Sequence, residues 1–192
     1  MNILFLGGSS FIGKHTVLEA ARRGHEVTLF NRGSNPPPVE SARRITGDRN
    51  RDLDLLAGER FDAVIDTSAY VPRQVTEAAR VLAGNVETYL FISTVSVYAS
   101  LTEPDLDEDA GLQELEDPAT EEVTGETYGG LKVLCERALE AAFPGRRLVV
   151  RPGVVAGPDD PTDRFTYWPV RVEAGGDVLA PGGRHVTLQF ID

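Results

Sequence analysis

Near the start of the chain, residues 2–13 read NILFLGGSSFIG. The apolar run over 2–6 predicts a buried β-strand, and a helix is expected to follow over 11–23. A glycine turn between such a strand and helix leaves backbone N–H groups at the helix start. Those groups and the helix dipole suit a pyrophosphate. Gly7 would make the tight turn, and Gly13 would let the helix pack close to the strand.

The glycines of this turn follow a Gly-x-x-Gly-x-x-Gly spacing in which Ser10 stands in the middle position. A glycine motif alone is weak, but here it opens the chain between a predicted strand and a predicted helix. The alternative is a structural turn in an α/β protein that binds no nucleotide. The predicted cofactor contacts of the turn are Gly7, Ser9, Ser10, Phe11, Ile12 and Gly13.

Downstream, short β-branched runs alternate with helical stretches. Strands are predicted over 2–6, 26–30, 43–46, 63–66, 88–93 and 147–150. Helices are predicted over 11–23, 52–56, 73–83 and 121–142, the last broken near Gly125. Such alternation implies parallel strands joined by right-handed crossovers. We therefore expect an α/β fold, a Rossmann-like doubly wound parallel sheet, with its ligand at the carboxyl ends of the strands.

The sequence after residue 158 predicts an organisation that differs from this strand-helix alternation. A helix is expected near 164–174, with short strands near 178–179 and 185–190, and the chain stops directly after an apolar run. We expect residues 1–158 to form an NAD(P)-binding Rossmann domain. Residues 159–192 would then be the beginning of a substrate-binding region that is cut short.

The net charge of −11 is concentrated in one segment. Residues 101–126 hold eleven of the 30 acidic residues and neither lysine nor arginine, so the rest of the chain is neutral. This argues against DNA and against RNA as partners, because both require a basic surface. The segment is expected to be a solvated loop, or a mobile flap over the site.

Other sequence features restrict the setting of the protein. No apolar run approaches the ~18 residues that span a bilayer, so no membrane association is expected. The N-terminus does not resemble a secretory leader, and the single cysteine, Cys135, excludes an intrachain disulfide. Cytoplasmic localisation is therefore expected. His15, His25 and His185 lack the spacing of metal ligands, and no metal site is expected.

The end of the second strand bears on the choice of cofactor. Where NAD-binding folds place an acid, this chain has Asn31, followed by Arg32. A guanidinium pairs well with a 2′-phosphate, so NADP is preferred over NAD; alternatively, Arg32 is a surface charge. After the third strand, Asp48 could accept a hydrogen bond from the adenine amine, or could simply be a turn residue.

Tyr128 and Lys132 are four residues apart, which places them on one face of the predicted helix. A nearby ammonium favours the phenolate, and the pair could exchange a proton with a substrate hydroxyl or carbonyl. Lys132 is one of only two lysines in the chain, whose other strongly basic side chains are all arginines. Ser93, Thr94 and Ser96, at the end of a central strand, offer hydroxyls for the substrate oxygen, and spacing does not choose among them.

These motifs, in this order, resemble the extended short-chain dehydrogenase/reductase family, which includes NAD-dependent sugar-nucleotide epimerases and dehydratases. The resemblance runs from Met1 to about Pro158, and the glycine turn and Asn31-Arg32-Gly33 look most like an atypical branch. That branch includes bacterial reductase- or epimerase-like proteins and plant chloroplast stem-loop-binding relatives. Ser10 and the early end of the chain depart from the family pattern.

The resemblance implies a role for each matching residue. Tyr128 would be the general acid/base, Lys132 its activator and ribose anchor, and Thr94 the hydroxyl donor, with Ser93 in reserve. Asp48 would contact adenine. The implied lining of the cofactor path at the end of the fourth strand is Thr67, Ser68 and Ala69.

The favoured function is that of an NAD(P)-dependent oxidoreductase or epimerase-like isomerase acting on a small molecule, such as a sugar nucleotide. The complete set of Thr94, Tyr128 and Lys132 favours an enzyme, because a pure binding protein does not need it. The alternatives are a non-catalytic nucleotide- or RNA-binding member of the same fold and an inactive truncated fragment. The sequence does not decide whether the protein forms a homodimer.

Overall fold

The computed structural model describes residues 1–102, 105–179, 182–183 and 189–191. The chain divides into two compact units, Met1–Arg151 and Pro152–Asp192.

The first unit is built on a six-stranded, all-parallel sheet with the strand order β3-β2-β1-β4-β5-β6. Its strands are β1 (Asn2–Leu6), β2 (Glu26–Asn31), β3 (Arg43–Thr46), β4 (Phe61–Asp66), β5 (Val86–Ile92) and β6 (Arg146–Val150). Its helices are α1 (Phe11–Arg22), α2 (Pro72–Leu82) and α3 (Tyr128–Ala142), with short 3-10 turns η1 (Leu53–Leu56) and η2 (Val95–Val97). The order reverses between β1 and β4, which creates the switch point where ligands of such folds bind. The predicted doubly wound parallel fold is confirmed.

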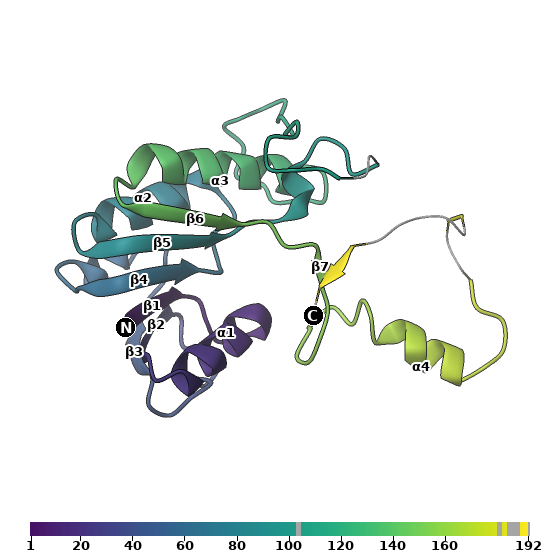
Figure 1. Cartoon of the computed structure of the whole chain (residues 1–192), viewed down its shortest axis with the longest axis horizontal. Helices are drawn as coiled ribbons and strands as arrows, with labels where there is room; N and C mark the ends of the chain where they lie inside the picture. Colours follow the sequence, from purple (N-terminus) through teal and green to yellow (C-terminus); the bar gives the residue numbers. More distant parts are fainter. Residues whose placement is uncertain (103–104, 180–181, 184–188, 192) are drawn as a thin grey trace. The chain divides into compact units, whose positions relative to one another are not determined.

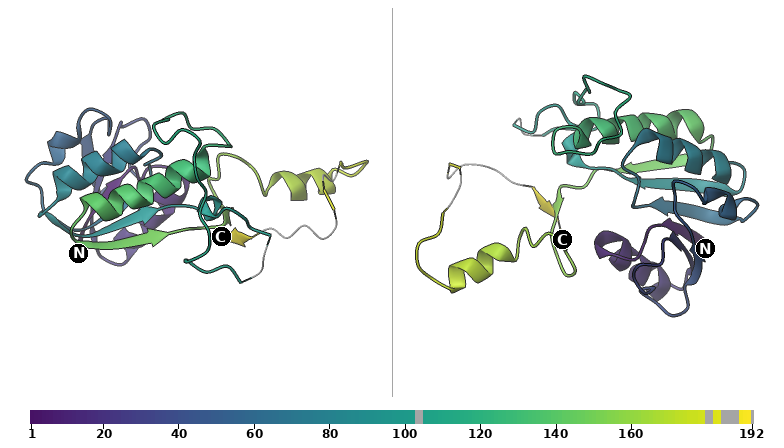
Figure 2. Two further views of the ribbon diagram at one scale, coloured as in Figure 1. Left: turned by 90° about the horizontal axis from the view of Figure 1, so that it is seen from above. Right: turned by 180° about the vertical axis from the view of Figure 1, so that it is seen from behind.

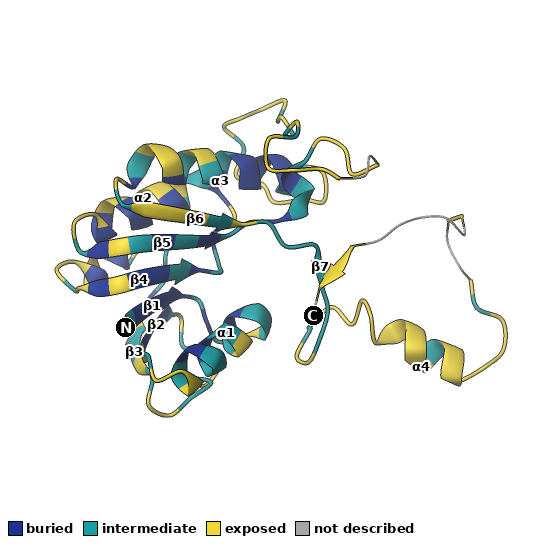
Figure 3. Cartoon of the chain, in the orientation of Figure 1, coloured by how far each residue is buried: buried dark blue, intermediate teal, exposed yellow. Residues whose placement is uncertain are grey.

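Helices cover both faces of this sheet (Figures 1 and 2). Because side chains alternate along a strand, Ile3 and Phe5 of β1 pack with α1, while Leu4 and Leu6 face the helices α2 and α3. The central strands are buried, whereas β6 at the edge is largely exposed (Figure 3). The burial of β1 on both faces explains its nearly continuous apolar sequence.

The structure corrects the sequence prediction before α3 and near the end of the chain. Residues 121–127 are not helical, and α3 begins at Tyr128, because Thr124 and Thr127 form local hydrogen bonds that compete with a helix. No strand forms over 178–179. The strand predicted over 185–190 lies mostly outside the described residues, and only its end coincides with β8 (Phe190–Ile191).

In the second unit, β7 (Val154–Val155) pairs in parallel with β8. The helix α4 (Tyr167–Glu173) is shorter than the 164–174 predicted and has no buried residue. None of the helices in the described part of the chain is both long and apolar enough to cross a membrane.

Candidate functional site

The glycine turn after β1 is shaped by close contacts that only glycine permits. Gly7 and Gly8 have φ values of +107° and +81°, in the region that other residues rarely adopt. A Cβ atom on Gly7 would lie 2.6 Å from Oγ1 of Thr67, and one on Gly13 would lie 2.9 Å from Cα of Gly8. The start of α1 is therefore held tightly against the end of β1.

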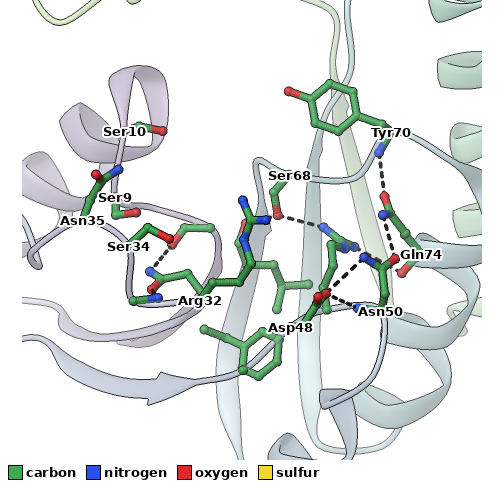
Figure 4. A pocket seen from close by; sticks show the side chains of 17 residues that line it. Ser9, Ser10, Arg32, Ser34, Asn35, Asp48, Asn50, Ser68, Tyr70 and Gln74 are labelled. Atoms are coloured by element: carbon green, nitrogen blue, oxygen red, sulfur yellow. Dashed lines mark hydrogen bonds between the residues drawn. The ribbon is translucent and has the colours of Figure 1, made fainter. Parts of the chain in front are cut away.

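A pocket of about 370 Å³ opens beside this turn, at the carboxyl ends of β1, β2 and β3 (Figure 4). Seven of the predicted cofactor residues line it: Gly7, Ser9, Ser10, Asn31, Arg32, Asp48 and Ser68. Figure 4 shows Ser9, Ser10, Ser34 and Asn35 on one side and Ser68, Tyr70 and Gln74 on the other. The structure thus brings together predicted residues from the carboxyl ends of four strands, β1, β2, β3 and β4.

The other predicted residues lie outside this pocket lining. Phe11, Ile12 and Gly13 are in the first turn of α1, and Phe11 has an unusual positive φ of 39°. Thr67 donates its hydroxyl proton to the carbonyl of Leu6, 3.2 Å away. Thr67 therefore fastens the end of β4 to the end of β1.

Asn31 uses both ends of its side-chain amide within the protein. Its Nδ2 donates to the carbonyl oxygen of Gly7 at 2.9 Å, and its Oδ1 accepts from the backbone N–H of Gly33 at 3.0 Å. The amide thus ties the end of β2 to the glycine turn. The neighbouring Arg32 is exposed and lines the pocket.

Asp48 caps a turn after β3. Its Oδ1 accepts from the backbone and side-chain N–H groups of Asn50, at 2.9 and 3.1 Å. The backbone hydrogen bond from Asn50 is the main reason that the pKa of Asp48 lies below its usual value. Asp48 is therefore an ionised acceptor at the pocket wall, which is compatible both with an adenine contact and with the alternative of a turn residue.

A buried ion pair that the sequence reasoning missed lies at the pocket wall, which Arg49 helps to line. Arg49 donates to both carboxylate oxygens of Asp66, at 2.8 and 3.0 Å, and Tyr89 donates its hydroxyl proton to Asp66 at 2.7 Å. Burial alone would raise the pKa of Asp66, but the charge and hydrogen bonds of Arg49 outweigh it, and the pKa is lowered. Arg49 also donates to Oγ of Ser68, which lines the pocket. The pair thereby orients a pocket residue.

Lys132 lies in the second turn of α3 and reaches the carboxyl ends of β4 and β5. Its Nζ donates to the carbonyl oxygens of Ala69 at 2.9 Å and of Ile92 at 2.7 Å, and it lies 4.0 Å from the centroid of the Phe91 ring. Burial lowers the pKa of Lys132 to about 8. Because an ammonium has three protons, two carbonyl contacts leave it the capacity to donate one more.

Tyr128 and Thr94 belong to the two elements that meet at this sheet edge. Tyr128 begins α3, and Thr94 caps the η2 turn, where its Oγ1 accepts from the backbone N–H of Ser96 and donates to Oγ of Ser96, each at 3.1 Å. A Cβ atom on Gly129 would lie 2.1 Å from the carbonyl oxygen of Ser96. Glycine after Tyr128 is therefore what lets α3 approach η2 so closely.

Tyr70, which the sequence reasoning also missed, connects the two parts of the site. It lines the pocket, its ring centroid lies 6.3 Å from that of Tyr128, and Nζ of Lys132 lies 5.8 Å from its centroid. Its position shortly after the buried strand β4 was the one available signal. Ser93 differs from expectation in that its hydroxyl donates to the carboxylate of Glu136.

Neither a metal centre nor a reactive thiol emerges from the geometry. Within the described residues, no group of three or more His, Cys, Asp or Glu side chains is placed to hold a metal. Cys135 is fully buried, and burial raises the pKa of its thiol to about 12. Cys135 is therefore a core residue.

Residues 3–87 match the model of the NAD dependent epimerase/dehydratase family. The family resemblance that the motifs predicted is thereby confirmed over this part of the chain, which is similar to the NAD dependent epimerase/dehydratase family. The matched residues include the glycine turn, Arg32 and Asp48. They end before Thr94, Tyr128 and Lys132.

Two curated proteins show the range of the relatives. The chloroplast stem-loop binding protein of 41 kDa b from Arabidopsis thaliana is 33% identical over 114 residues, covering 50% of this chain and 30% of that protein. A UDP-glucose 4-epimerase from Rhizobium meliloti is 25% identical over 173 residues, covering 78% of this chain and 50% of that protein. The chain thus spans half or less of the length of these two relatives.

Solved structures share the fold. The UDP-N-acetylglucosamine 4-epimerase from Methanobrevibacter ruminantium, in complex with UDP-N-acetylmuramic acid, matches with a TM-score of 0.75 at 20% identity. That match covers 99% of this chain and 68% of the epimerase. The Bordetella bronchiseptica enzyme WbmG in complex with NAD matches with a TM-score of 0.76 at 18% identity, covering 93% and 61%.

Proposed function

We propose that this chain is the cofactor-binding part of an NAD(P)-dependent oxidoreductase or epimerase that acts on a hydroxyl or carbonyl of a nucleotide sugar or a similar small metabolite. The observation that carries the proposal is the position of Lys132. Its ammonium is anchored at the carboxyl ends of β4 and β5, one helical turn beyond Tyr128. The glycine-lined pocket opens at the same sheet edge.

The residues present fit a dinucleotide. The glycine turn offers N–H groups at the start of α1, and the cradle would be filled by a Cβ atom on Gly7. In this proposal the pyrophosphate lies on Ser9 to Ile12, Asp48 accepts from the adenine amine, and Lys132 donates to the nicotinamide ribose. When bound, the dinucleotide supplies the hydride acceptor or donor.

The chain's own residues would manage the proton. Tyr128 takes the proton of the substrate hydroxyl during oxidation and returns it to the carbonyl oxygen during reduction. The positive charge of Lys132 favours the phenolate that accepts that proton. In this proposal the hydroxyl of Thr94 turns its proton from Oγ of Ser96 to the same substrate oxygen and holds that oxygen in place. Residues 1–158 bind the cofactor, and residues 159–192 contribute the beginning of the substrate-binding region.

The proposal also includes a preferred cofactor and a class of substrate. A preference for NADP over NAD rests on Arg32 at the pocket wall and on Asn31, which brings no negative charge to the position where an acid would repel a 2′-phosphate. A nucleotide sugar as substrate rests on the curated epimerase relative, whose name specifies UDP-glucose.

The proposal can be tested by mixing the protein with NAD⁺ or NADP⁺ and UDP-glucose and following the fluorescence of reduced nicotinamide. We expect emission that requires both the cofactor and the sugar nucleotide and that disappears in Tyr128→Phe. Retained emission in Tyr128→Phe would exclude the proton role. If neither dinucleotide binds in a parallel calorimetric titration, the proposed function fails.

A non-catalytic RNA-binding role is the second candidate, because the stem-loop binding protein of Arabidopsis is 33% identical over half of this chain. The net charge of −11 opposes it, since affinity for RNA rests largely on cations that contact phosphates. A gel-shift titration with a stem-loop RNA separates the two roles. Tight, salt-sensitive RNA binding without any dinucleotide affinity would favour the second candidate.

A further inference from the structure

Glu136 occupies a position on α3 that the proposed chemistry does not use. It lies four residues after Lys132, as Lys132 lies four after Tyr128, so the three side chains share one face of the helix. Its side chain is only 10% exposed. A carboxylate is rarely buried unless it is paired, so its partners indicate what it does.

The first partner of Glu136 is Ser93, which directly follows β5. The hydroxyl of Ser93 donates to Oε1 of Glu136, and Ser93 itself is 3% exposed. One turn earlier on the same helix, Nζ of Lys132 donates to the carbonyl of Ile92, the residue before Ser93. The helix α3 is therefore fastened at two successive turns to Ile92, the last residue of β5, and to Ser93 directly after it, immediately before Thr94.

The second partner is Arg151, at the end of β6. It donates to Oε2 of Glu136 through Nη2 at 2.7 Å and to Oε1 through Nε at 3.1 Å, a two-pronged ion pair. Its Nη1 also donates to the hydroxyl of Tyr98 at 3.1 Å, and the backbone N–H of Ser93 donates to the carbonyl of Val150 at 2.7 Å. The ion pair thus holds the carboxylate of Glu136 between β5 and β6.

We propose that Glu136 is a positioning residue that, through Ser93 and Arg151, fixes α3 against the end of β5 and so holds Lys132 and Thr94 in place. This inference rests on the proposed function of Tyr128, Lys132 and Thr94. It assigns Ser93 a supporting role rather than contact with the substrate, because Ser93 is 3% exposed and its hydroxyl donates to a carboxylate, a stronger acceptor than the Ser96 hydroxyl that Thr94 contacts.

The chain offers a direct spectroscopic probe of this arrangement. Lys14 and Lys132 are its only lysines, so a protein with isotopically labelled lysine gives two side-chain ammonium signals in NMR, which Lys14→Arg assigns. The experiment compares the whole chain as wild type, Glu136→Gln and Ser93→Ala. Glu140→Gln, which changes an exposed acid one turn further along α3, is the matched control.

In the wild type we expect slowly exchanging ammonium protons on Lys132, because two carbonyls hold them. In Glu136→Gln and in Ser93→Ala we expect the Lys132 signal to shift and its slow exchange to be lost. The Lys14 signal should not change in these variants. Glu140→Gln should give the same spectrum as the wild type. If Glu136→Gln does not fold, Ser93→Ala decides, because it removes only the hydroxyl and keeps the ion pair.

Superimposable Lys132 signals in the wild type and in the folded variants would overturn the positioning role. Adding NAD⁺ or NADP⁺ to the same samples tests the proposed function separately. A wild-type Lys132 signal that neither dinucleotide moves would count against the function, whereas the comparison of variants would still decide the role of Glu136 in fixing α3.

Discussion

The side-chain amide of Asn31 donates a hydrogen bond to the carbonyl oxygen of Gly7, with 2.9 Å between Nδ2 and O. This contact joins the end of β2 to the turn that is proposed to hold the pyrophosphate. A carboxylate has no proton to donate there. An acid at this position, which would suit NAD, would therefore disturb the glycine turn of this particular chain.

Asn31→Asp tests that contact. We expect the free energy of unfolding at neutral pH to fall by about 1–3 kcal/mol, because the carbonyl of Gly7 loses its donor and faces a negative charge. Urea denaturation measures the change. Asn35→Asp adds the same charge to an exposed residue of the neighbouring loop and should stay within about 0.5 kcal/mol of wild type. Equal stability of the two variants would show that the contact is unimportant.

Arg32→Ala tests the proposed preference for NADP. Loss of a charged hydrogen-bonding partner of the 2′-phosphate should weaken NADP⁺ binding about 10- to 100-fold and leave NAD⁺ binding nearly unchanged. Isothermal calorimetry with both dinucleotides gives the two dissociation constants. Arg51→Ala removes an exposed arginine that is not part of the pocket lining and should change neither value. A parallel loss for both cofactors in Arg32→Ala would remove the argument for 2′-phosphate recognition.

Gly129→Ala tests the close approach of α3 to η2. The added Cβ atom would lie 2.1 Å from the carbonyl oxygen of Ser96, so the backbone must move, at a cost of roughly 1–3 kcal/mol. We expect a matching drop in stability and loss of turnover, because Tyr128 and Lys132 shift with the helix. Gly125→Ala is the control, since a Cβ atom there meets nothing within 4 Å. Thermal denaturation of both variants decides the point.

Lys132→Met tests the buried ammonium through the pH dependence of stability. The pKa of Lys132 is about 8 in the folded chain, lowered by burial from the ordinary value of 10.5. Between these values the unfolded chain holds a proton that the folded chain has released, so stability rises with pH. From pH 8 to about 10.5 the wild type should gain about 3 kcal/mol relative to Lys132→Met. Denaturation curves of equal pH dependence would contradict the burial of this amine.

Much of the fold was predictable because its signals are local. The buried strand β1 is a continuous apolar run, and Gly24 and Gly84 end α1 and α2 near the predicted positions. The prediction of a helix over residues 121–127 was wrong, because threonine side chains form hydrogen bonds with the backbone there and so compete with the helix. Helical periodicity does not reveal such competition.

The candidate site was predictable where a motif has fixed spacing, as in the glycine turn and the pair Tyr128 and Lys132. The ion pair between Arg49 and Asp66 was not, because its partners come from different loops and only the folded sheet brings them together. The same holds for Glu136 and Ser93, which are 43 residues apart. Long-range polar pairs of this kind leave no local pattern in a single sequence.

The most direct test of a cofactor that extends from the glycine turn to α3 is a calorimetric titration of wild type and Lys132→Met with NAD⁺ and NADP⁺ at neutral pH. We predict that the wild type binds a dinucleotide and that Lys132→Met binds it about tenfold more weakly, as expected for one lost charged hydrogen bond to the ribose. Absence of binding, or equal affinity in a folded Lys132→Met, would contradict the account.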